Sequence, residues 1–375
     1  MVNVKIVALL IVAIVVIAGA SLLLVQPYEK QEVTIIAQVN SEGSAIFVED
    51  GITDVSQFGG NVFATPGPAS IQHMMLMNYV LDNGLKWASA PSEGVAKQSD
   101  TVYWVRVAPT NMNKTMADGT INGGIAWEPY NSEIVAAGNA NIYKWSDELV
   151  AAHPCCVLAV NSKFLKENPR TVERYLAAHI LATQWIVDTF EGGPSANYTL
   201  LLEMGADFAG IPESVVEDSL GHVTFNYTMD AVWKQALEEV VQTYSDLGQF
   251  DRTLTSMGYN NSAEFVEEFV DVKPLQNAMS LQPLVEGSAL EDVRVGWLAG
   301  DIHQLARLVG MNETVGQNFG FGDRTIFEAH GINVIGGDGN PYANGGFVMD
   351  AFFNKAIDIG YLGAPPAVLK TVNTV

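Results

Sequence analysis

The longest apolar stretch of the chain lies at its N-terminus. The twenty residues from Ile6 to Val25 carry no charge, and at about 1.5 Å per helical residue they can cross the roughly 30 Å hydrocarbon layer of a membrane. Lys5 precedes them, which favours a cytoplasmic N-terminus. A cleaved signal peptide is the alternative, because Ala18-Gly19-Ala20 resembles a small-residue cleavage site. Either interpretation places the rest of the chain outside the cytoplasm.

After a polar tether at residues 26–31, short apolar runs alternate with longer runs of helical periodicity. The short runs, rich in β-branched residues, predict strands at 33–39, 44–48, 61–65, 102–107, 125–127, 155–160, 293–298 and 357–361. The periodic runs predict helices at 71–81, 164–190, 198–204, 213–220, 229–247, 264–270 and 301–309. This alternation is typical of an α/β protein built from βαβ units with mainly parallel sheets.

Two distant segments, 118–129 and 354–365, share one layout. Each has a helix end, then Ile followed by Asn or Asp, a short apolar strand, and a loop that closes on proline. Such a repeat indicates two similar lobes that face each other across a cleft. Ligands bind at the carboxyl ends of strands in such sheets. The alternative is that both segments are ordinary connections within one large sheet.

Chain length, net charge and the two cysteines limit the possible domain count and partners. A chain of 375 residues has room for two domains, and a net charge of −23 argues against nucleic acid and anionic lipid surfaces as partners. The only cysteines, Cys155 and Cys156, are adjacent in an apolar run. They are most simply buried strand residues, and a vicinal redox pair or metal ligands are the alternatives.

The sequence offers no pattern typical of an enzyme. HExxH, GxSxG, a P-loop, a Cys/His cluster with metal-ligand spacing and the dinucleotide-binding glycine pattern are all missing from it. We therefore predict no cofactor and no catalytic or metal-binding residues. An acid/base pair of Glu128 and His303 is the enzymatic alternative, but a binding role needs only polar complementarity.

Several segments together resemble a family of transport proteins. Residues 60–72, 126–129, 153–160, 167–169, 295–303, 327–334 and 358–366 resemble the nitrate/sulfonate/taurine and thiamine-precursor group of ABC-transporter substrate-binding proteins. The resemblance implies a two-lobed periplasmic binding protein fold of type II, with two crossing strands near 44–48 and 155–160. It covers nearly everything after residue 32.

The order of the segments departs from the family. Family members begin with the segment that here lies at 293–370, so the chain resembles a circularly permuted member. Permutation requires old termini that a linker can join and new ends in an exposed loop, and we expect Val375 to lie near Glu32. The resemblance implies a membrane anchor or signal segment with tether at 1–31, lobe I at 32–48, 155–274 and 293–375, lobe II at 49–154, and a permutation linker at 275–292.

The same resemblance implies ligand-binding loops at strand ends. The residues expected there are Asn40, Glu42, Gly43, Ser44, Thr65, Gly67, Ser70, Trp127, Glu128, Trp297, Gly300, Asp301, His303, Tyr361, Leu362, Gly363 and Ala364. Gly67 to Ser70 and Gly363 to Pro366 would place backbone N–H groups at helix starts, which suits an anionic group. The aromatic residues Trp127, Trp297 and Tyr361 would form walls, although each is also a candidate for the core.

These inferences predict an extracytoplasmic, monomeric receptor that delivers a small organic anion or zwitterion to the permease and ATPase subunits of an ABC importer by hinge closure. The candidate loops carry Glu42, Glu128 and Asp301, and almost no Lys or Arg. That balance favours a ligand with an amino or heteroaromatic cationic part, such as an aminosulfonate or a pyrimidine, over bare nitrate. An enzyme of the same fold and an exterior sensor domain are the alternatives.

Overall fold

The computed structural model describes residues 32–92, 94–150, 153–337 and 340–374. The predicted membrane segment, Ile6 to Val25, lies outside these residues. In the part of the chain that is described, no helix is both long and apolar enough to cross a membrane.

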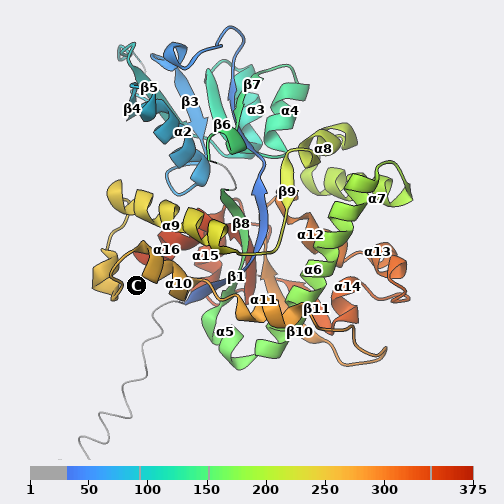
Figure 1. Cartoon of the computed structure of the whole chain (residues 1–375). Helices are drawn as coiled ribbons and strands as arrows, with labels where there is room; N and C mark the ends of the chain where they lie inside the picture. The colour runs from blue at the N-terminus through green and yellow to red at the C-terminus, as the bar shows by residue number, and fades with distance from the viewer. Residues whose placement is uncertain (1–31, 93, 151–152, 338–339, 375) are drawn as a thin grey trace, which may run out of the picture.

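Two six-stranded sheets organise the chain (Figure 1). Sheet A has the order β11 (Ile332–Gly336), β10 (Glu291–Gly296), β12 (Ile359–Gly363), β8 (Pro154–Asn161), β1 (Val33–Glu42) and β9 (Val223–Phe225). Sheet B has the order β4 (Lys86–Ser89), β5 (Thr101–Arg106), β3 (Val62–Thr65), β6 (Gly123–Trp127), β2 (Ser44–Val48) and β7 (Asn141–Trp145).

The predicted mainly parallel pairing is wrong, because both sheets are mixed. Five strand pairs are parallel and five are antiparallel. The antiparallel pairs all involve β1, β2 or β8, the strands at the two places where the chain passes from one sheet to the other. Sheet A has two parallel and three antiparallel pairs, and sheet B has three parallel and two antiparallel pairs. The βαβ units therefore account for only part of each sheet.

The two sheets repeat one arrangement. In sheet A, β12 lies between parallel β10 and antiparallel β8, and in sheet B, β6 lies between parallel β3 and antiparallel β2. Strands β6 and β12 are the strands of the two segments that share a sequence layout. The repeat detected in the sequence therefore corresponds to equivalent strands of two similar halves.

The chain crosses between the sheets twice. Strand β1 of sheet A continues into β2 of sheet B through Gly43 alone, and the return path leads from β7 through the 3-10 helix Ser146–Glu148 to β8. Glu42 and Gly43 both adopt left-handed backbone conformations, with φ of 63° and 79°. These two positions turn the chain sharply at the boundary between the halves.

Helices cover both faces of each sheet. The helices of the sheet A half are α5 (Ser162–Glu167), α6 (Pro169–Gly192), α7 (Ala196–Ala209), α8 (Glu213–Leu220), α9 (Ala231–Asp246), α10 (Ser262–Phe269), α11 (Lys273–Ala278), α12 (Leu305–Gly310), α13 (Glu313–Asn318), α14 (Ile326–Ala329), α15 (Gly345–Phe353) and α16 (Ala364–Asn373). Those of the sheet B half are α2 (Ile71–Asp82), α3 (Pro109–Ala117) and α4 (Tyr130–Ala136). Further 3-10 helices span Val55–Phe58, Leu254–Met257 and Ile302–Gln304.

The core follows the pleat of the central strands. In β8, Val157 and Ala159 join the cluster under α9, α10, α15 and α16, whereas Leu158 and Val160 join the cluster under α6 and α12. A third cluster lies between sheet B and helices α3 and α4. Successive side chains of a strand point to opposite faces, so each face of β8 packs against a different cluster.

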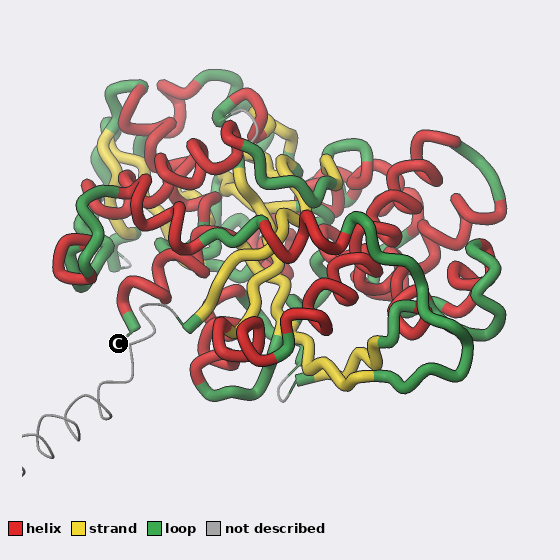
Figure 2. The backbone as a smooth tube through the Cα atoms, turned by 60° about the horizontal axis from the view of Figure 1, so that its bottom comes forward, coloured by secondary structure: helices red, strands yellow, loops and turns green. Residues whose placement is uncertain are grey.

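The end of α16 and the start of β1 lie side by side in both views of the backbone (Figures 1 and 2). Val375 itself lies outside the described residues. Circular permutation requires such neighbouring ends, and it stays a prediction.

Candidate functional site

A cavity of about 350 Å³ lies between the two halves. The sheet B half contributes the turn before α2, the end of β5 and the end of β6. The sheet A half contributes the start of β8, the loop after β10 and the starts of α15 and α16. The lining residues are Pro66, Ala69, Ser70, Ile71, Gln72, Arg106, Trp127, Cys155, Cys156, Leu298, Asp301, His303, Asn344, Gly345, Gly346, Phe347, Asp350, Gly363, Pro365, Pro366 and Lys370.

Three helix N-termini point into this cavity, those of α2, α15 and α16. Ser70 caps α2 by accepting a hydrogen bond from His73 N–H, and Asn344 caps α15 by accepting one from Phe347 N–H. In α16, Pro365 and Pro366 have no N–H, so its first turn contributes fewer donors than the sequence pattern suggested. Helix N-termini carry partial positive charge, and together they favour a bound anion.

Two cationic side chains add to this positive potential. Arg106 ends β5, is exposed, and lies over Gly67, where a Cβ atom would come within 3.1 Å of the guanidinium Nε. Lys370 of α16 pairs with Asp350 of α15 at 2.7 Å. The candidate loops themselves carry almost no Lys or Arg, and both of these cations reach the cavity from outside those loops.

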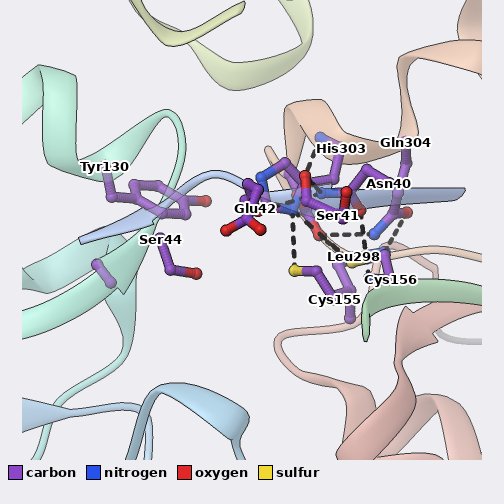
Figure 3. Close-up of polar contacts among 12 residues, drawn as sticks. Asn40, Ser41, Glu42, Ser44, Tyr130, Cys155, Cys156, Leu298, His303 and Gln304 are labelled. Atoms are coloured by element: carbon purple, nitrogen blue, oxygen red, sulfur yellow. Dashed lines mark hydrogen bonds and ion pairs between the residues drawn. The ribbon is translucent and has the colours of Figure 1, made fainter. Parts of the chain in front are cut away.

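Four polar side chains form the buried floor of the cavity: Cys155, Cys156, Asp301 and His303, each no more than 4% exposed. His303 Nδ1 lies 3.6 Å from Cys155 Sγ, 3.8 Å from Cys156 Sγ and 3.5 Å from Asp301 Oδ1 (Figure 3). Cys156 Sγ lies 3.8 Å from Asp301 Oδ2. We call these four residues the floor cluster.

The groups of the floor cluster perturb one another. Burial raises the pKa of Asp301. Burial alone would lower the pKa of His303, but the Asp301 carboxylate and the Cys155 thiol raise it above its ordinary value. The hydrogen bond from Cys156 and the nearby His303 lower the pKa of the Cys155 thiol. The charge of each of these groups therefore depends on its neighbours in the cluster.

A bulge in β8 brings both cysteines to one side of the sheet. Asn40 pairs with Cys156 and the next residue, Ser41, pairs with Pro154, so Cys155 is the extra residue of the strand. Both thiols consequently join the same core cluster, although adjacent strand residues normally point to opposite faces. Cys156 N–H donates to Asn40 Oδ1, which fixes the bulge.

A second polar group ties the two crossings together. Glu42 Oε2 accepts a hydrogen bond from Ser146 Oγ at 3.0 Å and lies 3.1 Å from His153 Nδ1. Burial would lower the pKa of His153, but hydrogen bonds with Cys155 and Glu42 raise it to about 9. The imidazolium and the carboxylate thus form a charged contact between β1 and the return path.

Glu128 lies on the same boundary. Its backbone N–H donates to Gly43 O, and its carboxylate accepts hydrogen bonds from Ser132 N–H and Ser132 Oγ. Burial raises the pKa of Glu128 to about 7, although the hydrogen bonds from Ser132 oppose the shift. Glu128 does not line the cavity, so its contact with the ligand stays a prediction.

The cavity is lined by some of the residues expected from the sequence, namely Ser70, Trp127, Asp301, His303 and Gly363. Others lie directly behind the lining. Ser44 Oγ accepts a hydrogen bond from Gln72, Thr65 Oγ1 contacts His73 Nδ1 at 2.9 Å, and Asn40, Glu42, Gly43 and Gly67 have the contacts given above.

The remaining expected residues lie elsewhere in the fold. Tyr361 is fully buried and its hydroxyl contacts Tyr175 and His179, while Leu362 and Ala364 are core residues. Trp297 stacks under the Arg307 guanidinium at 4.0 Å. Gly300 faces Tyr130 of the other half, whose hydroxyl lies 3.0 Å from the site of a Cβ atom.

Several lining residues were missed by the sequence analysis. Arg106 and Lys370 are isolated cations without a motif around them. Asn344-Gly-Gly, by contrast, is a helix start with two residues that allow close approach of a ligand to the backbone, and a search for capped helix starts would have found it.

Comparisons with known proteins agree with the architecture. The NMT1-like family matches residues 10–193. The periplasmic nitrate-binding protein NrtA from Synechocystis PCC 6803 is similar in structure, with a TM-score of 0.50 and 14% identity over 68% of each chain. No curated protein matches the chain.

Two further solved structures show weaker likeness. The ligand binding component of an ABC-type import system from Staphylococcus aureus, with zinc bound, has a TM-score of 0.49 and 15% identity over 66% of this chain and 75% of that one. The alkanesulfonate-binding protein SsuA from Xanthomonas axonopodis pv. citri, bound to MOPS, has a TM-score of 0.47 and 14% identity over 64% of this chain and 74% of that one. The two-sheet topology and the likeness to NrtA confirm the predicted fold in its coarse form, an α/β, two-sheet fold like that of type II periplasmic binding proteins.

Proposed function

We propose that this protein is an extracytoplasmic solute-binding receptor that captures a small organic anion between its two halves and presents it to an ABC importer. The observation that carries the proposal is the cavity itself, where three helix N-termini and Arg106 meet a mostly apolar wall. A protein anchored by Ile6 to Val25 would hold this cavity next to its permease. The nitrate-binding and sulfonate-binding proteins of similar structure support the assignment.

The lining favours a ligand with two different ends. Arg106 and the helix N-termini suit a sulfonate or carboxylate, and Ile71, Leu298 and Phe347 suit an apolar body. Asp301, on the buried floor, adds negative charge that suits an amino group. We therefore expect organic sulfonates and carboxylates, amino-bearing ones included, to bind more strongly than nitrate or other inorganic anions.

A thermal-shift screen of the full chain in detergent tests this ranking. The panel contains taurine, simple alkanesulfonates, the matching carboxylates, nitrate and a pyrimidine, and hits are measured by calorimetry. A preference for nitrate over every organic anion would contradict the proposed ligand class, and product formation without added partners would favour an enzyme.

A substitution that removes the charge of Arg106 tests whether the anion binds in this cavity. We expect R106Q to weaken binding of the best anion at least tenfold, because the guanidinium is the cavity's exposed cation and Lys370 is already paired with Asp350. R170Q is the matched control, since Arg170 lies on α6 and pairs with Glu173 on the surface. Equal affinities of the two variants would place the anion elsewhere.

A further inference from the structure

We propose that Cys155, Cys156 and His303 of the floor cluster bind a single thiolate-preferring metal ion of the zinc type, with Asp301 beside them. This site goes beyond the proposed capture of an organic anion, since its three donors, Cys155, Cys156 and His303, are not among the groups proposed to hold the anion. The inference rests on the distances between the donor atoms, on the bulge that brings them together and on their chemistry.

The distances between the donor atoms match a tetrahedral site. Zinc binds thiolate sulfur at about 2.3 Å and imidazole nitrogen or carboxylate oxygen at about 2.0 Å, so donors at tetrahedral angles lie about 3.3 to 3.8 Å apart. The measured separations from His303 Nδ1 to the two sulfurs are 3.6 Å and 3.8 Å. Asp301 approaches His303 with Oδ1 and Cys156 with Oδ2, so it lies beside the three donors and leaves the fourth position of the site open. The ligand atoms of the two cysteines and His303 all lie within 4.8 Å of one another.

The backbone holds these donors in place. The bulge at Cys155 turns its side chain to the same side as that of Cys156, and Asn40 Oδ1 binds the Cys156 N–H. Asp301 caps the 3-10 helix Ile302–Gln304 by accepting a hydrogen bond from His303 N–H, while Gln304 Nε2 donates to Asp301 Oδ2 at 2.9 Å. Since second-shell hydrogen bonds orient metal ligands, these contacts hold Asp301 and the backbone that carries His303 in place beside the thiols.

The donor set selects the class of metal. Two sulfurs and one imidazole nitrogen favour zinc-type ions, whereas calcium and magnesium prefer an all-oxygen set. All four residues line the cavity as well, so an ion could enter from it and would add positive charge to its floor. A pair of cysteines used only for packing would not need a histidine and a carboxylate within contact distance.

Metal content and cobalt spectroscopy of the full chain test the proposal. The protein is purified in detergent under reducing conditions, stripped with a chelator, reloaded with Zn²⁺ and dialysed. We expect one zinc per chain by elemental analysis. With Co²⁺ as the probe, we expect sulfur-to-cobalt charge-transfer absorption and the intense visible bands of a tetrahedral site.

Variants assign the ligands. We expect C155S/C156S to lose the stoichiometric zinc and H303A to bind it at least tenfold more weakly, while H222A, at a half-buried histidine outside the cluster, keeps it. Because the buried variants could misfold, protection of the wild-type thiols from alkylation by Zn²⁺ gives a readout without substitution.

Three results would overturn the site: less than half an equivalent of zinc in the reloaded wild type, a cobalt spectrum without sulfur charge transfer, or full zinc content in C155S/C156S. The anion screen is run on the chelator-stripped protein, and R106Q should keep its zinc. Failure of the metal site and failure of the proposed function are thereby separate outcomes.

Discussion

At the scale of single residues, Gly43 allows the crossing from β1 to β2 to pack closely against His303 and Val223. It is the one residue between β1 and β2, its φ is 79°, and a Cβ atom there would lie 2.7 Å from His303 Nε2 and 2.8 Å from Val223 Cγ2. A side chain at this position would be strained by the backbone conformation and would also displace the imidazole of the floor cluster.

We expect G43A to lower the free energy of unfolding by about 3 kcal/mol, because left-handed strain of roughly 1–2 kcal/mol adds to the cost of overpacking. G51A is the matched control, since Gly51 has a φ of 92° with nothing within 4 Å of its Cβ site; it should lose only about 1 kcal/mol. Urea unfolding of both variants measures the difference. Equal losses would mean that the close contact with His303 is unimportant.

His73 is a buried histidine, and its burial disfavours the protonated form of the ring. Its ring contacts Thr65 Oγ1 and lies edge-on to Trp87 and Trp104. Burial lowers its pKa from 6.5 to about 4. The folded state therefore binds fewer protons than the unfolded state between about pH 4 and pH 6.5, so stability falls as the pH drops through this window.

Between pH 7 and pH 5 the loss from His73 amounts to about 2 kcal/mol. We expect H73Q to remove most of this part of the acid dependence, measured as the free energy of unfolding at both pH values. H222Q should change it less, because His222 is only half-buried. An unchanged pH dependence in H73Q would show that folding does not lower the pKa of His73.

The sequence predicts single site residues where a local rule applies. Ser70 and Asp301 follow strands and begin helices, so their place beside the cavity follows from the pattern. Arg106 and Lys370 come into the cavity through the packing of β5 and α16, which no local pattern records. Tyr361 follows the strand-end rule as well, but β12 turns its side chain into the core.

At the scale of elements, β8 shows why a correct strand prediction can still give the wrong direction for its side chains. Its apolar run predicts the strand, and strict alternation would separate the two cysteine side chains. The bulge breaks this alternation at Cys155 because the partner strand β1 is itself irregular there. A bulge depends on the pairing of two distant strands, so one strand's sequence does not reveal it.

The N-cap of α15 allows a test that separates stability from binding. We expect N344A and N261A each to lose about 1 kcal/mol of stability, since each asparagine accepts a hydrogen bond from a backbone N–H of its helix. Of the two asparagines, Asn344 lines the cavity and Asn261 does not. Only N344A should therefore also weaken anion binding, by two- to fivefold.

Thermal unfolding and calorimetry of the two cap variants measure both effects. Normal anion affinity in N344A would mean that the α15 N-terminus does not contact the ligand. Reduced affinity in N261A, at the remote helix α10, would instead indicate a general loosening of the fold.

At the scale of the whole molecule, the sequence predicts the α/β class and the repeated strand-loop unit, and both follow from short-range patterns. It missed β4, β7, β9 and β11, which are partly exposed or very short. It also overestimated parallel pairing, since strand direction depends on where the chain crosses between the halves. The permuted order and the domain boundaries remain predictions that topology alone does not decide.

A hydrogen bond joins the two halves: Tyr130 Oη of α4 donates to Ala299 O, beside Gly300, at 3.1 Å. If the proposed hinge motion takes place about the two crossings, it would separate α4 from the loop after β10 and break this bond. We therefore expect Y130F to favour the open arrangement, with a larger radius of gyration by X-ray scattering and anion affinity reduced two- to tenfold. Y79F is the control, since Tyr79 bonds to Tyr143 within one half; if Y79F opens the molecule equally, the Tyr130 contact does not govern closure.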